Sequence, residues 1–129
     1  KALEILISEG VKPQAITVAH LSDTSDMEYV FQILEKGCFI GFDRLYNITN
    51  EEYINLKVNN IKYLCENGYS DKILLSHDAL FFNGFETEHK INEKPRFEYC
   101  FEHILPNLPK QTVEEIMIKN PIKMLKCGK

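Results

Sequence analysis

The sequence lacks a basic cluster, a long apolar stretch and a paired-cysteine motif. Its 15 Lys and Arg residues are scattered along 129 residues, and the formal net charge is −4. Such a chain does not have the basic face on which nucleic-acid binding depends. No segment approaches the ~20 apolar residues that a membrane-spanning helix needs, and no secretory signal sequence is recognisable. We therefore expect neither a nucleic-acid partner nor insertion in a membrane.

The use of cysteine points to a reducing compartment. None of the four cysteines belongs to a CxxC pair, and their spacings match no zinc ribbon. Cys38 begins an apolar segment and Cys65 lies on an apolar helix face, so both are expected to be small core residues. A cytoplasmic location is expected from this pattern. The sequence also has no GxSxG, GxxxxGK[ST] or HExxH motif.

A repeated pattern dominates what is present. Three times, a helix-like segment stops at a glycine and is followed by a short apolar segment that ends on a polar residue. The glycines are Gly10, Gly37 and Gly68. The expected strands are residues 16–19, 38–42 and 73–75. Repetition of helix, glycine and strand builds parallel sheets, and α/β enzymes keep their chemistry at the C-terminal ends of such strands.

Apolar residues at helical spacing predict the elements between these strands. A first helix is predicted over residues 1–9, where Gly10 supplies the C-terminal stop. The second helix is predicted to begin at a cap formed by Ser25 or Asp26. A third helix is predicted to begin at residues 50–52 and to carry apolar residues on one face.

The last third of the chain is predicted to hold a long loop and two helices. The loop at residues 81–95 is long for a compact α/β unit, which is typical of a functional segment. A helix is predicted over residues 97–104. The final helix is predicted to begin at residue 112 and to end by Asn120-Pro121, because a residue before proline disfavours helical backbone.

These elements predict an α/β fold that forms one piece of a larger domain. The chain is 44% hydrophobic, which is enough for one packed unit. Three βα units are too few for a closed (β/α)8 barrel, and a three-stranded parallel sheet alone would leave one face unburied. We therefore interpret residues 1–129 as a single partial domain, with the missing part expected before Lys1.

Polar residues that suit catalysis follow each expected strand. His20 comes directly after the first strand, and a neutral imidazole there is a candidate metal ligand. Asp78 ends the third strand, where a carboxylate can bind a metal and accept a proton. Asp23 is a candidate proton relay, and Arg44 can grip a substrate oxygen. The alternatives are a rim histidine for His20, helix caps for the two aspartates, and a plain ion pair for Arg44.

Three segments carry a resemblance to a known family. VAHLSDTSD at 18–26, CFIGFDR at 38–44 and ILLSHD at 73–78 resemble strands six, seven and eight of the phosphotriesterase family, in that order. ILPNL at 104–108 and IKNP at 118–121 are similar to the C-terminal tail of that family. The resemblance implies that the chain is the C-terminal part, about three βα units, of a TIM (β/α)8 barrel.

The resemblance also implies a chemistry and a role for each candidate residue. The family binds two divalent metal ions, most often zinc, bridged by a hydroxide that attacks phosphoester or lactone centres. His20 matches a ligand of the more exposed metal, and Asp78 matches both a ligand of the more buried metal and the acceptor of the proton from the hydroxide. Asp23 matches the acidic relay residue.

Two departures favour lactones over organophosphates as substrates. Arg44 completes the Asp-Arg pair of the lactonase-like branch, where phosphotriesterases proper tend to have histidine. Ala79 follows Asp78, where organophosphate-degrading members tend to have an aromatic residue. The expected partner is therefore a small lactone or ester, and homodimerisation stays open.

The family's other metal ligands would lie before Lys1, so we expect this segment alone to be inactive. Two further hypotheses stay open at this point. One is a catalytically inert relative that acts as a binding or scaffold protein, and the other is a small independent α/β binding domain.

Overall fold

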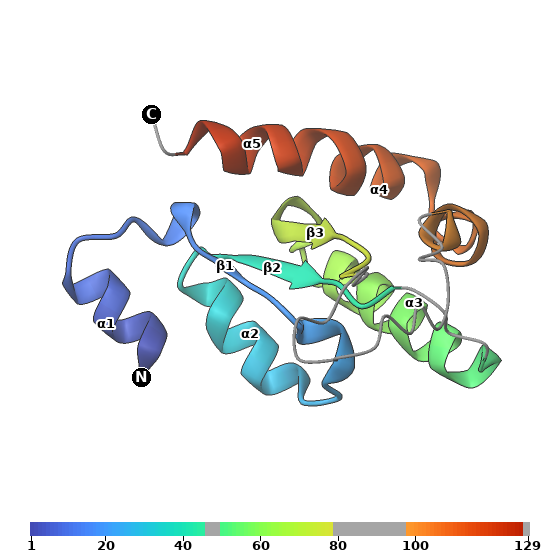
Figure 1. Ribbon diagram of the computed structural model, residues 1–129, viewed down its shortest axis with the longest axis horizontal. Coiled ribbons are helices and arrows are strands. Elements are labelled where there is room, and N and C mark those ends of the chain that lie inside the picture. The colour runs from blue at the N-terminus through green and yellow to red at the C-terminus, as the bar shows by residue number, and fades with distance from the viewer. Residues whose placement is uncertain (46–49, 79–97, 128–129) are drawn as a thin grey trace, which may run out of the picture.

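A parallel sheet of three short strands forms the centre of the structure, a computed structural model that describes residues 1–45, 50–78 and 98–127 (Figure 1). The strands are β1 (Thr17–Val18), β2 (Phe39–Phe42) and β3 (Ile73–Leu75), in the order β1-β2-β3. In the parallel register, Ile40 lies opposite both Val18 and Ile73. The three strands predicted from the sequence are therefore confirmed, each within two residues of its expected ends.

Three helices lie on one side of this sheet (Figure 1). They are α1 (Ala2–Ser8), α2 (Met27–Glu35) and α3 (Glu51–Glu66). Asp26 caps α2, because its side chain accepts a hydrogen bond of 3.0 Å from the Tyr29 amide. Of the two predicted caps, Asp26 rather than Ser25 is the one that the structure shows. Asn50 caps α3 in the same way, accepting from the Glu52 amide at 2.9 Å.

The C-terminal helices form one long rod that contacts β3 and lies above the sheet in the view of Figure 1. The rod comprises α4 (Lys110–Glu114), a π-helical turn (Glu115–Lys119) and α5 (Asn120–Lys126). The prediction that the last helix ends by Asn120-Pro121 is wrong, because the helix continues to Lys126. A proline ring clashes with the carbonyl four residues earlier in a regular α-helix, and the wider π-helical turn directly before α5 changes that spacing.

Before this rod, the chain turns through two short helical segments. The helix predicted over residues 97–104 is described from residue 98, and most of it is a π-helical turn at Cys100–Ile104. A 3-10 turn at Leu105–Asn107 follows and contains Pro106. The loop predicted at 81–95 lies outside the described residues. In the described ranges, no helix is both long and apolar enough to cross a membrane.

The core is built around β2, whose four residues are all buried. Phe39, Ile40 and Phe42 are each 0% exposed. A central parallel strand that is covered on both faces has this uninterrupted apolar character. Gly41 allows a close approach between β2 and the residue that follows β1, since a Cβ atom there would lie 3.1 Å from the Ala19 Cα atom. The middle strand is therefore held between its neighbours with little room for side-chain variation.

The N-terminal ends of the strands are closed by the C-terminal rod. Asn120 is 0% exposed, and its Nδ2 donates hydrogen bonds to the carbonyls of Ser70 at 2.7 Å and Ile73 at 2.8 Å. Lys123 forms an ion pair with Asp71 in the same region. These contacts attach the rod to the start of β3. The rod therefore does not cover the C-terminal ends of the strands.

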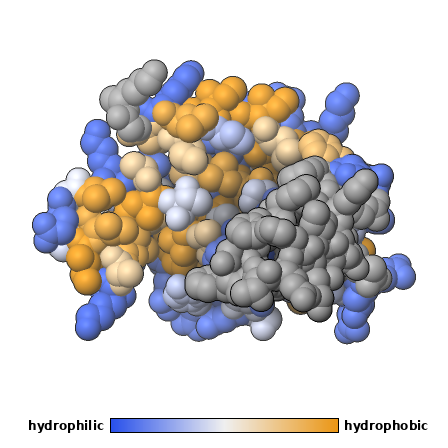
Figure 2. All heavy atoms as spheres, in the orientation of Figure 1, coloured by the Kyte–Doolittle hydropathy of each residue, from blue (hydrophilic) through white to orange (hydrophobic). Residues whose placement is uncertain are grey.

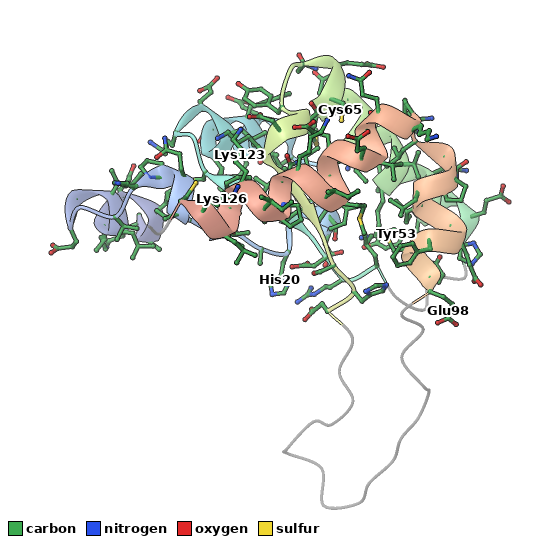
Figure 3. All side chains as sticks on the ribbon, turned by 90° about the horizontal axis from the view of Figure 1, so that it is seen from above. His20, Tyr53, Cys65, Glu98, Lys123 and Lys126 are labelled. Atoms are coloured by element: carbon green, nitrogen blue, oxygen red, sulfur yellow. The ribbon has the colours of Figure 1, made fainter. Side chains whose placement is uncertain are left out.

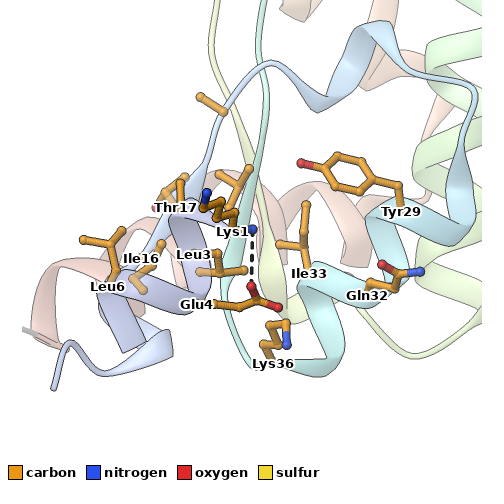
Figure 4. A pocket seen from close by; sticks show the side chains of 13 residues that line it. Lys1, Leu3, Glu4, Leu6, Ile16, Thr17, Tyr29, Gln32, Ile33 and Lys36 are labelled. Carbon is orange, nitrogen blue, oxygen red and sulfur yellow. Dashed lines mark ion pairs between the residues drawn. The ribbon is translucent and has the colours of Figure 1, made fainter. Parts of the chain in front are cut away.

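The described surface carries apolar side chains at α1 and along α5 (Figure 2). They include Leu6 at 44% exposure and Leu125 at 71% exposure. A groove of about 430 Å³ lies between α1, β1 and α2, where Ile16 and Ile33 contribute to its wall (Figure 4). β1 has one hydrogen-bonded neighbour in the described sheet, because it stands at the edge of the strand order.

We expect Asn120→Ala to lower the free energy of unfolding of the full-length protein by about 1–3 kcal/mol, because it leaves the buried Ile73 carbonyl and the part-buried Ser70 carbonyl without their donor. Urea denaturation measures this difference. The matched control is Asn59→Ala on the exposed face of α3, which should change stability by no more than about 0.5 kcal/mol. Equal effects of the two substitutions would contradict the role of Asn120 as an anchor.

Candidate metal-binding site

The four residues singled out in the sequence lie together at the C-terminal ends of the strands. Arg44 Nη1 donates to Asp23 Oδ2 at 2.8 Å, and Arg44 Nε donates to Asp78 Oδ2 at 3.3 Å. His20 Nδ1 lies 3.7 Å from the same Asp78 oxygen. Because these residues follow three different strands, the sheet itself places them side by side. Figure 3 shows His20 at this end of the molecule, away from the C-terminal rod.

Left-handed backbone marks the places where the chain leaves the strands. In the described part of the chain, the non-glycine residues with positive φ are His20 at 63°, Arg44 at 56° and Asp78 at 50°. An ordinary side chain in this region costs on the order of 1 kcal/mol or more, and such strain clusters at functional sites. All three are residues that the sequence had singled out. The same backbone turn at each strand end brings their side chains to one point.

Asp43 is a site residue that the sequence reasoning did not select. Its side chain is 8% exposed, and Oδ1 lies 2.9 Å from His20 Nδ1 while Oδ2 accepts a hydrogen bond of 3.0 Å from the His20 amide. An imidazole that donates Nδ1–H to a carboxylate keeps its Nε2 lone pair for a metal. Asp43 thus fixes both the backbone and the ring of His20. Its position directly after β2 was the signal that could have identified it.

Asp23 is held by donors on both carboxylate oxygens. Oδ1 accepts from the Tyr53 hydroxyl at 2.9 Å and from Lys57 Nζ at 3.1 Å, while Oδ2 faces Arg44. Burial by itself raises the pKa of Asp23, but the hydrogen bonds from Lys57, Arg44 and Tyr53 outweigh it and lower that pKa to about 2. Because Asp26 caps α2, Asp23 is not needed as the cap that was its alternative role.

Lys57 is the second residue that the sequence reasoning missed. It lies on α3 with its side chain 0% exposed, and its Nζ also donates to the Ser22 carbonyl at 3.2 Å. Its ammonium lies 4.4 Å from the centre of the Tyr53 ring. Burial lowers the pKa of Lys57, and the hydrogen bond with Asp23 opposes this shift. A lysine at helical spacing with the buried Asn60, Ile61 and Leu64 was the available signal.

The donor atoms at this site suit a divalent transition metal. His20, Asp43 and Asp78 each offer a ligand atom, and these atoms lie within 4.8 Å of one another. One imidazole nitrogen with carboxylate oxygens is a ligand set that zinc accepts. Since Asp43 already holds His20 Nδ1, the atoms left free to bind a metal are His20 Nε2 and the Asp78 carboxylate. A tetrahedral catalytic zinc takes three protein ligands, so these two make up part of such a site.

The low pKa of Asp23 predicts a specific dependence of stability on pH. A carboxyl group whose pKa falls from 3.8 to about 2 on folding stabilises the protein above pH 4. This contribution, at most about 2 kcal/mol, is lost as the pH falls from about 4 to 2. Denaturation of the full-length protein and of Asp23→Asn at several pH values measures it. Identical pH dependence in the two proteins would contradict the anchored state of Asp23.

Comparisons with known proteins agree with this geometry. The profile described as "Phosphotriesterase family" matches residues 1–125. The chain is 35% identical over 124 residues to the aryldialkylphosphatase of Saccharolobus solfataricus, which covers 92% of this chain and 39% of that protein. It is 30% identical over 139 residues to the phospho-furanose lactonase of Mycoplasmopsis synoviae, covering 96% of this chain and 38% of that protein.

A solved structure shows the same fold. The phosphotriesterase from Mycobacterium tuberculosis superposes with a TM-score of 0.78 and 22% identity, over 96% of this chain and 40% of that one. The prediction that the three βα units are part of a (β/α)8 barrel is confirmed. The chain spans about two fifths of the length of the curated relatives described above. With a family profile that matches nearly its whole length, the chain belongs to the phosphotriesterase family.

Proposed function

We propose that the full-length protein is a metal-dependent hydrolase that opens lactones or cleaves related esters. The observation that carries this proposal is the meeting of His20, Arg44 and Asp78 at one point, with separations of 3.7 Å and 3.3 Å to Asp78 Oδ2. A metal ligand, a substrate-binding cation and a proton acceptor then lie within reach of one substrate group. The family membership supports the same class of reaction.

Each residue has a distinct task in this proposal. His20 presents Nε2 to a divalent metal, because its Nδ1 is engaged by Asp43. Asp78 contributes a carboxylate ligand and accepts the proton that water loses as it attacks. Bound divalent ions, with zinc the best match to these donors, supply the polarisation that makes water nucleophilic at neutral pH. Arg44 is half exposed, with 49% of its side chain accessible, so its guanidinium can also contact a substrate oxygen.

Asp23 is proposed to support catalysis as the acidic relay behind Arg44. Arg44 donates to both Asp23 Oδ2 and Asp78 Oδ2, so its guanidinium holds the two carboxylates side by side without itself carrying the proton. Lactones are favoured as substrates because one relative of this chain is named a phospho-furanose lactonase. The other relative is named an aryldialkylphosphatase, and a phosphotriester is therefore the substrate to compare.

We expect Asp78→Ala to reduce lactone hydrolysis by the full-length protein by about 100- to 10,000-fold, because it removes a metal ligand and the general base together. Steady-state kinetics with a panel of γ- and δ-lactones and one aryl phosphotriester measures the loss. The matched control is Asp71→Ala, which removes a carboxylate at the opposite end of β3. Appreciable activity in Asp78→Ala would contradict the proposed site.

Metal removal provides a second, independent expectation. A chelator should abolish lactone hydrolysis by the full-length protein, and added Zn²⁺ should restore it, because water at the site needs a Lewis acid at neutral pH. Metal analysis should find fewer bound divalent ions in His20→Ala than in the wild-type protein. Full activity after exhaustive chelation, with no bound metal detected, would overturn the metal-dependent reaction.

A further inference from the structure

Lys57 carries a buried charge that has no role in the proposed reaction. It lies seven residues into α3, its side chain is fully buried, and it reaches the loop that follows β1. Burying an ammonium group is costly unless it is paired and hydrogen-bonded. Here the charge is paired with Asp23 at 3.1 Å and also bonded to the Ser22 carbonyl at 3.2 Å. A hydrophobic residue would fill the same space without this cost, so the location of the charge needs an explanation.

The contacts of Asp23 divide between its two oxygens. Oδ1 receives the Lys57 ammonium and the Tyr53 hydroxyl, both from α3. Oδ2 receives Arg44 Nη1 at 2.8 Å. Tyr53 and Lys57 are one helical turn apart and lie against each other, with the ammonium 4.4 Å from the ring centre. Together they hold Asp23 Oδ1 from the side of α3, and this orients Asp23 Oδ2 toward Arg44.

Arg44 is the group that this arrangement controls. Its guanidinium is half exposed, and a long side chain at such a position has many rotamers unless it is held. Asp23 holds Nη1 and Asp78 holds Nε, so the guanidinium is fixed at two points. If Asp23 could rotate, one of these two points would be lost. The buried Lys57 therefore acts on the site through two ion pairs, Lys57–Asp23 and Asp23–Arg44.

We propose that Lys57, with Tyr53, is a positioning residue that holds Asp23 so that Arg44 is fixed where a substrate oxygen binds. Lys57 itself does not touch the substrate in this proposal. Its effect on catalysis rests on the proposed hydrolase function, whereas its effect on the Asp23–Arg44 ion pair does not. A helix on the outside of the barrel therefore contributes to the geometry of the site at the strand ends.

The test uses matched substitutions in the full-length protein. Lys57→Met keeps an unbranched side chain one atom shorter and removes its charge, while Tyr53→Phe removes only the hydroxyl that bonds Asp23. Lys62→Met makes the same chemical change as Lys57→Met on the exposed face of α3 and serves as the control. Tyr53→Phe also keeps the proposal testable if Lys57→Met does not fold.

Crystal structures provide the readout that is independent of activity. We expect the Arg44 Nη1–Asp23 Oδ2 contact to be lost in Lys57→Met and lengthened or disordered in Tyr53→Phe, and to be kept in Lys62→Met. If the contact is kept in both test variants, the proposal is overturned, whatever their stability. This arm gives a result even if the protein hydrolyses no lactone, which would overturn the proposed function alone.

Kinetics then separates positioning from simple stabilisation. We expect Lys57→Met to lower kcat/KM for a lactone by about 10- to 100-fold, as small displacements of a substrate-binding group do. Tyr53→Phe should lower it in the same direction by a smaller factor. In an Arg44→Met background, adding Lys57→Met should cost less than about 2-fold, because the two residues act through one path. Equal losses in both backgrounds would show that Lys57 acts independently of Arg44 and would overturn the proposal.

Discussion

The two ion pairs of Arg44 connect the ends of all three strands. Asp23 follows β1, Arg44 follows β2 and Asp78 follows β3, and the guanidinium joins the two carboxylates at 2.8 Å and 3.3 Å. Asp43 adds a third negative charge beside His20. Carboxylates this close to one another repel, and the site tolerates them because Arg44 and the buried Lys57 lie among them. These two cations offset part of the repulsion between the acidic residues at the strand ends.

The N-terminal and C-terminal ends of the strands have different roles. At the N-terminal ends of the strands, Asn120 is hydrogen-bonded to the start of β3 and holds the C-terminal rod there. At the C-terminal edge, His20, Arg44 and Asp78 leave their strands in left-handed conformations and expose polar atoms. Strain of this kind persists where the surrounding structure is well determined. The fully buried strand β2 supplies that support, because its neighbours pack against it on both sides.

Much of this architecture could be predicted from local sequence. Short apolar segments after Gly10, Gly37 and Gly68 identified the strands, and three of the four residues selected for the site follow those strands within two or three positions. The prediction was wrong at Pro121, since a π-helical turn before it lets the helix continue. Local rules treat proline as a stop because they assume regular helix spacing. The π-helical turn packs against β3, and this tertiary contact is not visible in the local sequence.

The sequence by itself determined which residues stand at the strand ends, because strand length and glycine stops are local properties. It did not determine that Asp43 bonds His20 or that Lys57 lies under Asp23, since these pairs are separated by 23 and 34 positions in the chain. Lysine is a residue that local rules place at the surface. The tertiary structure decided otherwise, because the packing of α3 against the sheet brings Lys57 beside the Asp23 carboxylate, which pairs with its charge.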